Sequence, residues 1–381
     1  MALSPDDDLD RIAAELDAPL LKAAPRKGGT RLDVWLRVLA EREASDLLLI
    51  AGEPPTLRIH GRLLRTESPR VDGQDVEEMV LPELPMHAQR HYRERGTADA
   101  SRKLAGVGRF RINLHRERGR AAATIRMLPA RIPTLESLDL PQGTAMLSRL
   151  PRGLVLIGGA TGSGKTTTLA ALVDDINKRD AKHIITIEDP IEYEHVNQLS
   201  VIQQVEVGVD APDFPTALRS ALRQAPDVIV VGEMRDPETM KIALAAGETG
   251  HLVFSTLHTT DVPSTLSRMT DSFPAERQPT IRQEIAAALS AVFVQTLLPR
   301  RSGAGRIPAA EMLVVSYGAR QHIRRNALQH LQQEITITRK QGSFSLEECL
   351  ARLVKSGAVD RAEAAIRANH PQDFELALSV Q

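Results

Sequence analysis

The chain has 381 residues, 42% of them hydrophobic, which predicts a globular protein of about two domains. Its 48 lysine and arginine residues are balanced by 49 aspartate and glutamate residues, and the net charge of −1 argues against a protein that coats nucleic acid or an anionic membrane. The single cysteine, Cys349, excludes an internal disulfide and a four-cysteine zinc site, and it indicates a reducing compartment.

The sequence carries no clear membrane-spanning stretch and no export signal. The best candidate for a span, residues 286–298, is shorter than the roughly 20 residues required and contains Ser290 and Gln295. The first eight residues are acidic, unlike the basic start of a signal peptide. We therefore expect a cytoplasmic protein.

The N-terminal segment, residues 1–29, begins acidic and ends with basic and glycine residues, which predicts a flexible tail. The alternative is a short amphipathic helix over residues 10–21.

Residues 30–128 predict a small α+β domain. Apolar residues recur at helical spacing over residues 32–39, whereas residues 56–61 alternate like a half-buried strand. The expected helices are 32–39, 75–81 and 85–93, and the expected strands are 47–50, 56–61, 109–113 and 121–128.

Two prolines, Pro129 and Pro133, predict a linker over residues 129–136. Residues 137–375 then alternate between strand and helix patterns, which is typical of an α/β domain with a parallel sheet and helices on both faces. The expected strands are 154–157, 183–187, 228–231 and 251–256, and the expected helices include 275–297, 345–355 and 360–368.

Residues 159–166 fit the G-x-x-x-x-G-K-[ST] pattern of a P-loop that binds the phosphates of a nucleotide. An apolar strand precedes them and a helix follows, so backbone N–H groups at the helix start can face an anion. We expect Lys165 to bridge the β- and γ-phosphates of ATP and the Thr166 hydroxyl to hold Mg²⁺. The expected nucleotide contacts are Gly159, Ala160, Thr161, Gly162, Ser163, Gly164, Lys165, Thr166 and Thr167.

Acidic residues follow two of the predicted strands. Glu233 comes after strand 228–231, with Gly232 where P-loop enzymes usually have aspartate, and a glutamate there can bind metal-bound water. A second cluster, residues 188–194, follows strand 183–187, and one of its carboxylates could position the attacking water.

Two histidines, His251 and His258, flank the predicted strand 251–256. They could detect a γ-phosphate beside the P-loop, or they could be ordinary structural histidines.

Arginines are concentrated in the small domain. They could form a solvated basic surface, an RNA-facing surface, or arginine fingers that act across a subunit boundary. Phe110 is the only aromatic residue among them, so a platform for single-stranded nucleic acid has little support. The arginines are Arg109, Arg111, Arg116, Arg118, Arg120 and Arg126.

Four sequence blocks together resemble one family. They are the P-loop block 158–168, the aspartate box 184–193, the Walker B block 221–236 and the histidine box 249–260. With these blocks, residues 30–375 resemble the PilT-like retraction ATPases of type IV pili, within the secretion-ATPase superfamily.

The resemblance implies a PAS-like small domain, a RecA-like ATPase domain and a ring of six subunits with ATP between domains of different subunits. It also implies that Glu192 is the catalytic carboxylate, that Glu233 is the Walker B glutamate and that His251 and His258 form the histidine box. The arginines that would reach the phosphates are Arg111, Arg118 and Arg126, which we expect on strands of the small domain.

The resemblance further implies ATP and Mg²⁺ as cofactors, and a location at the inner face of the cell membrane through an inner-membrane pilus platform protein. A second pilus ATPase is a possible partner, whereas nucleic acid and direct membrane insertion are not expected.

Some positions depart from the retraction pattern. Residues 224–226, Gln-Ala-Pro, are similar to the accessory PilU type, and the retraction-associated C-terminal motif survives only in part at residues 319–325. ATP hydrolysis is therefore better supported than retraction. The alternatives are an accessory ATPase, a type II secretion or DNA-uptake ATPase, a nucleic-acid motor and a non-hydrolysing ATP-binding scaffold.

Overall fold

The computed structural model describes residues 29–379 except His60 and Ala304. The predicted tail and the alternative helix over residues 10–21 therefore lie outside the described residues. The chain divides into two compact units, Met1–Arg131 and Ile132–Gln381, and each is described by itself.

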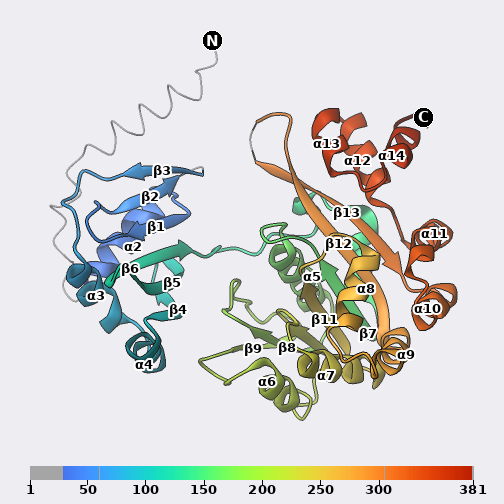
Figure 1. Cartoon of the computed structure of the whole chain (residues 1–381), viewed down its shortest axis with the longest axis horizontal. Coiled ribbons are helices and arrows are strands. Elements are labelled where there is room, and N and C mark those ends of the chain that lie inside the picture. Colours follow the sequence, from blue (N-terminus) through green and yellow to red (C-terminus); the bar gives the residue numbers. More distant parts are fainter. Residues whose placement is uncertain (1–28, 60, 304, 380–381) are drawn as a thin grey trace. The chain divides into compact units, whose positions relative to one another are not determined.

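The first unit contains a six-stranded antiparallel sheet in the order β3-β2-β1-β6-β5-β4, drawn in blue to teal in Figure 1. Three helices pack against one face of the sheet and share a single apolar core with it. The elements are α2 (Arg31–Glu41), β1 (Asp46–Leu49), β2 (Thr56–Ile59), β3 (Arg62–Arg65), α3 (Gly73–Val80), α4 (Met86–Arg95), β4 (Thr97–Leu104), β5 (Gly108–Glu117) and β6 (Arg120–Met127).

Local sequence explains most of these boundaries. Thr30 and Asp33 form a capping box at the start of α2, and Gly96 ends α4 with a φ of 74°. Along β5, Phe110, Ile112 and Leu114 are buried while the residues between them are more exposed, which is the alternation expected of a sheet with one covered face.

The second unit is built on a seven-stranded sheet in the order β13-β12-β7-β11-β10-β8-β9. All neighbouring pairs are parallel except β12 and β13. The strands are β7 (Gly153–Gly158), β8 (His183–Glu188), β9 (Val201–Glu206), β10 (Val228–Val231), β11 (Leu252–Leu257), β12 (Leu289–Pro299) and β13 (Arg306–Val314).

Helices cover both faces of this sheet, as the alternating pattern predicted (Figure 1). Leu154 and Leu156 of β7 belong to one apolar core with α6 to α9, whereas Val155 and Ile157 belong to another with α5. The helices are η4 (Gln142–Arg149), α5 (Lys165–Arg179), α6 (Phe214–Ala221), α7 (Pro237–Glu248), α8 (Val262–Asp271), α9 (Gln278–Ala288), α10 (Tyr317–Arg324), α11 (Leu331–Ile337), α12 (Leu346–Lys355), α13 (Arg361–Arg367) and α14 (Pro371–Ser379).

The predicted helix over residues 275–297 is wrong in its second half. Helix α9 ends at Ala288, and the chain continues directly into the long strand β12. Val292 and Phe293 are buried there between β7 and β13, so pairing on both edges favours a strand. Apolar residues alone could not distinguish a buried helix from a buried strand.

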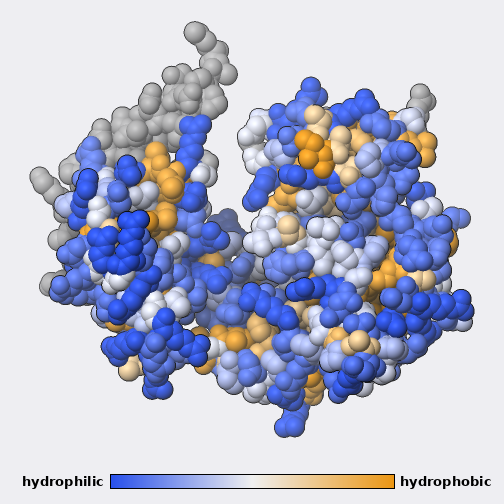
Figure 2. Space-filling model, viewed as in Figure 1, coloured by the Kyte–Doolittle hydropathy of each residue, from blue (hydrophilic) through white to orange (hydrophobic). Residues whose placement is uncertain are grey.

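The C-terminal helices pack on the outer end of the β12–β13 hairpin. Leu346 and Leu350 of α12 share a core with Leu298 and Ile307 of the hairpin. Figure 2 shows hydrophobic surface near these helices. Ile366 of α13 and Leu376 of α14 are exposed. None of the described helices is long and apolar enough to cross a bilayer.

Candidate nucleotide site

The P-loop lies between the buried strand β7 and helix α5. Gly162 and Gly164 have positive φ angles of 77° and 89°, which favour glycine. A Cβ atom on Gly159 would lie 2.3 Å from Ser163 Oγ, and one on Gly164 would lie 2.8 Å from Gln295 Nε2. Side chains at these glycines would therefore force the loop open.

Lys165 points into this loop at the start of α5. It is 8% exposed, and its Nζ donates to the carbonyl oxygens of Gly159 at 2.8 Å and Ala160 at 3.0 Å. Burial lowers the pKa of Lys165, while the nearby carboxylates of Glu233 and Glu192 act in the opposite direction. The ammonium group is thus held inside the loop with both acidic side chains in electrostatic range.

Ser163 supplies a further polar atom in the loop. Its Oγ is buried and has no hydrogen-bond partner within the described part of the chain. A buried hydroxyl without a partner is costly, and a bound anion with acceptor oxygens would satisfy it. The loop interior therefore fits a phosphate group.

Gln295 supports the loop from the neighbouring strand β12, and sequence reasoning missed this role. Its Oε1 accepts a hydrogen bond from Thr168 Oγ1 at 2.7 Å, and its Nε2 donates to the carbonyl oxygen of Ser163 at 2.7 Å. A polar residue inside an apolar run was the available signal, but its role depended on recognising β12 as a strand.

Glu233 follows β10 at the same edge of the sheet. Its side chain is 16% exposed, its Oε1 accepts from Arg235 Nε at 2.8 Å, and its Oε2 lies 3.9 Å from His258 Nε2. The structure also explains Gly232, because a Cβ atom there would lie 3.1 Å from the carbonyl oxygen of Ile187. Close packing of β10 against β8 thus leaves little room for an aspartate.

His258 lies just beyond β11, beside the P-loop. Its Nδ1 is 3.5 Å from Thr161 Oγ1. Burial lowers the pKa of His258, and the charge of Lys165 lowers it further, so the imidazole is neutral at neutral pH. A neutral imidazole can both donate and accept hydrogen bonds near a phosphate.

His251 lies at the opposite end of β11 from the P-loop, and its predicted part in nucleotide binding stays a prediction. Its carbonyl oxygen accepts from Gly153 N at the start of β7, and its Nδ1 is 3.1 Å from the carbonyl oxygen of Ala246. The six-residue strand β11 spans about 20 Å, so His251 is far from the P-loop of its own unit.

Glu192 lies in the loop after β8, and its carboxylate acts on the charge of Lys165, as described above. The next residue, Tyr193, is buried, and its hydroxyl is 3.0 Å from Thr167 Oγ1. The Thr167 hydroxyl, which we expected to contact the nucleotide, is therefore already paired. Thr166 is half-buried in the first turn of α5, and Ala160 and Thr161 are exposed at the tip of the loop.

The three selected arginines belong to the first unit, and only two of them lie on strands. Arg111 and Arg126 pair directly across β5 and β6, so they share one face of the sheet. Arg126 Nε donates to Asp46 Oδ1 at 2.8 Å. Arg118 instead lies in the turn between the strands, with a φ of 50° and an ion pair to Glu117, which corrects its predicted position on a strand.

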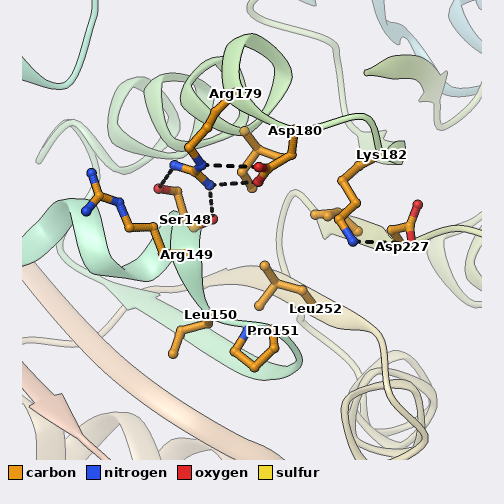
Figure 3. Close-up of a pocket in the computed structure, with 11 residues that line it drawn as sticks. Ser148, Arg149, Leu150, Pro151, Arg179, Asp180, Lys182, Asp227 and Leu252 are labelled. Carbon is orange, nitrogen blue, oxygen red and sulfur yellow. Dashed lines mark hydrogen bonds and ion pairs between the residues drawn. The ribbon is translucent and has the colours of Figure 1, made fainter. Parts of the chain in front are cut away.

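A separate pocket of about 260 Å³ lies at the other edge of the second unit's sheet, where β10 and β11 begin (Figure 3). Four of its charged side chains form two ion pairs. Arg179 donates to Asp180 Oδ2 at 2.9 Å, and Lys182 Nζ lies 3.6 Å from Asp227 Oδ1. We interpret these lining residues as a surface ion-pair network, and the pocket is distinct from the P-loop site.

In the second unit, a buried parallel strand leads into a glycine loop, and the loop encloses a lysine at the start of a helix. This arrangement places the unit among the P-loop nucleotide hydrolases. The family model for type II/IV secretion system proteins matches residues 56–355. The chain belongs to this family of ATPases, and the predicted resemblance to its PilT-like members is confirmed.

Individual relatives match nearly the whole chain. It is 40% identical to the type IV pilus retraction ATPase PilT of Pseudomonas aeruginosa over 88% of this chain and 97% of the relative. It is 35% identical to the type IV pilus ATPase PilU of the same organism over 91% of this chain and 90% of the relative. The solved structure of the pilus retraction motor PilT with bound ADP has a TM-score of 0.81 and 40% identity, over 90% of this chain and 98% of that one.

Proposed function

We propose that this chain is a Mg²⁺-dependent ATPase motor that powers type IV pilus retraction and twitching motility as a homohexameric ring. The observation that carries the proposal is the enclosed Lys165 ammonium with Glu192 and Glu233 in electrostatic range. The 40% identity to a retraction ATPase, over 97% of that relative, supports the cellular role.

The oxygen ligands available at the P-loop fit Mg²⁺ bound together with nucleotide. No group of three or more histidine, cysteine, aspartate or glutamate side chains in the described residues could hold a metal alone. Mg²⁺ commonly combines one or two protein oxygens with substrate phosphates and water. Thr166 and Glu233 would supply those oxygens, Glu233 through metal-bound water, and the ion would neutralise charge on the phosphates.

We assign a separate role to each remaining group. Lys165 would bridge the β- and γ-phosphates, with the backbone of residues 159–164 around them. Glu192 would orient and deprotonate the attacking water, and His258 would contact the γ-phosphate. Arg111, Arg118 and Arg126 would serve the site of a neighbouring subunit.

The same proposal includes the domain plan and the cellular setting. Residues 30–128 would be a PAS-like domain, 129–136 a linker and 137–375 a RecA-like domain with C-terminal helices. The ring would lie in the cytoplasm at the inner face of the membrane, held by a pilus platform protein, with a second pilus ATPase as a possible partner.

Replacing Glu192 with glutamine should separate catalysis from binding. The variant should bind ATP nearly normally and lose about a hundredfold or more in kcat, because a general base or water-orienting group is removed. Nucleotide titration and phosphate release would measure the two quantities. The matched control is Glu194→Gln, an exposed carboxylate two residues further along the same loop, which should retain its rate. Equal loss of ATP affinity in Glu192→Gln would contradict this role.

Deletion in the source organism would test the cellular role. We expect excess, immobile pili and loss of twitching, because assembly would continue without retraction. The Gln224-Ala225-Pro226 sequence and the similarity to PilU favour an accessory role as the second candidate, for which pilus number would stay normal and twitching under load would weaken. Absence of pili, or normal pili together with unchanged twitching under load, would contradict both roles.

A further inference from the structure

Gln204 of strand β9 makes three hydrogen bonds to the segment that contains Glu192. Its Oε1 accepts from the backbone N–H of His195 at 2.8 Å. Its Nε2 donates to the carbonyl oxygen of Tyr193 at 2.8 Å and to Glu188 Oε1 at 3.1 Å. One amide side chain thus fixes two backbone groups of the loop that follows β8.

Glu188, the last residue of β8, contacts the loop through Gln204. Its Oε1 accepts from Thr186 Oγ1 at 2.7 Å and from Gln204 Nε2 at 3.1 Å. Burial raises the pKa of Glu188, and the hydrogen bonds from Thr186 and Gln204 oppose that shift by stabilising the ionised carboxylate. Glu188 is half-buried and links β8 to Gln204, the residue that holds the loop.

Glu206 adds a third support from β9. It is buried, and its Oε2 accepts from the backbone N–H of Ile191 at 3.2 Å. Gln204 and Glu206 are two residues apart in a strand, so both side chains lie on the same face of the sheet. In register, Gln204 pairs with Thr186 and Glu206 pairs with Glu188.

These three side chains, Glu188, Gln204 and Glu206, form a polar clamp on the loop over residues 189–195. Through backbone hydrogen bonds Gln204 and Glu206 hold Ile191, Tyr193 and His195, which lie on both sides of Glu192. Tyr193 in turn contacts Thr167 just after the P-loop. Strands β8 and β9 therefore hold the backbone that carries Glu192.

We propose that the polar clamp is a set of positioning residues for ATP hydrolysis, with Gln204 at its centre, and that it acts through Glu192. This inference rests on the proposed role of Glu192 as the group that orients the attacking water. A displacement of about 1 Å at such a group can cost on the order of a hundredfold in rate without weakening substrate binding.

The test replaces Gln204 with methionine, which has a similar length and no amide. We expect kcat to fall by about 10- to 100-fold while the dissociation constant for ATP stays within about twofold. Gln203→Met is the matched control, because Gln203 is the preceding residue of β9 and points to the opposite face. It contacts His183 rather than the loop and should retain its rate.

A double-mutant cycle with Glu192→Gln identifies the route of the effect. If Gln204 acts through Glu192, adding Gln204→Met to Glu192→Gln should change the residual single-turnover rate by less than about twofold. If Gln204→Met lowers the rate by the same factor in the wild type and in Glu192→Gln, the clamp proposal is overturned. A normal rate in Glu192→Gln alone would instead overturn the catalytic role on which the clamp depends.

A second pair of variants covers the case in which Gln204→Met does not fold. Glu206→Gln keeps an acceptor oxygen for the N–H of Ile191, whereas Glu206→Leu removes it. We expect the glutamine variant to retain most of its kcat and the leucine variant to lose about tenfold, with equal ATP affinity. Equal rates in the two variants would overturn the proposal.

Discussion

Replacing Lys165 with alanine is expected to reduce ATP turnover to background, a loss of about 10³-fold or more. The lysine is enclosed by its own loop, and its ammonium is bonded to the carbonyl oxygens of Gly159 and Ala160. Alanine would remove the charge that should meet the β- and γ-phosphates. Steady-state phosphate release and nucleotide titration would measure the loss of rate and of affinity.

Lys178→Ala is the matched control for this experiment. Lys178 lies in the last turn of the same helix and forms a partly exposed ion pair with Asp174. Partly exposed pairs of this kind contribute about 0–1 kcal/mol, so the variant should fold and hydrolyse ATP normally. Wild-type turnover in Lys165→Ala would show that the P-loop assignment is wrong. Stimulation of wild-type turnover by DNA or RNA, by about tenfold or more, would favour the nucleic-acid motor instead.

The P-loop could be predicted from the sequence because its determinants are local. Three glycines, one lysine and two flanking apolar segments fix the turn and the helix start within a short stretch. The support from Gln295 could not be predicted in the same way. This support depends on pairing between strands that are more than 130 residues apart. It was also missed because the apolar run that contains Gln295 was predicted as a helix.

The histidine box and the arginines show two other limits on what could be predicted from the sequence. In the sequence, His251 and His258 both flank one predicted strand and look alike. In the structure they lie at opposite ends of that strand, and only His258 is beside the P-loop. Arg118 was predicted on a strand, yet Arg118 and Gly119 form a hairpin turn with φ angles of 50° and 77°. An X-Gly pair between two strand-like segments was the signal for that turn.

The arginine prediction distinguishes a ring motor from a monomeric ATPase. Arg126 is 65% exposed on β6, and its guanidinium is oriented by the buried carboxylate of Asp46. An exposed, oriented arginine outside the P-loop unit is suited to another subunit's nucleotide. Arg126→Ala should then lose about 10³-fold in rate, the usual cost of removing an arginine finger.

The control for Arg126→Ala is Arg58→Ala, because Arg58 contacts the same carboxylate from the neighbouring strand β2. If the loss came only from an unpaired Asp46, both variants would lose rate to a similar degree. We expect Arg58→Ala to stay within a few-fold of the wild-type rate, since its loss removes an ion pair and no contact to phosphate.

Mixing two inactive variants gives the more direct test of action between subunits. Arg126→Ala and Glu192→Gln, combined in one preparation, should form rings in which some interfaces carry both an intact arginine and an intact glutamate. Activity should partly return at those interfaces, and turnover per subunit of the wild type should rise with protein concentration. If the two variants co-assemble, as shown by co-purification of differently tagged chains, and activity stays at background, Arg126 does not act in trans. The basic face of the first unit's sheet would then be a solvated surface held in place by Asp46.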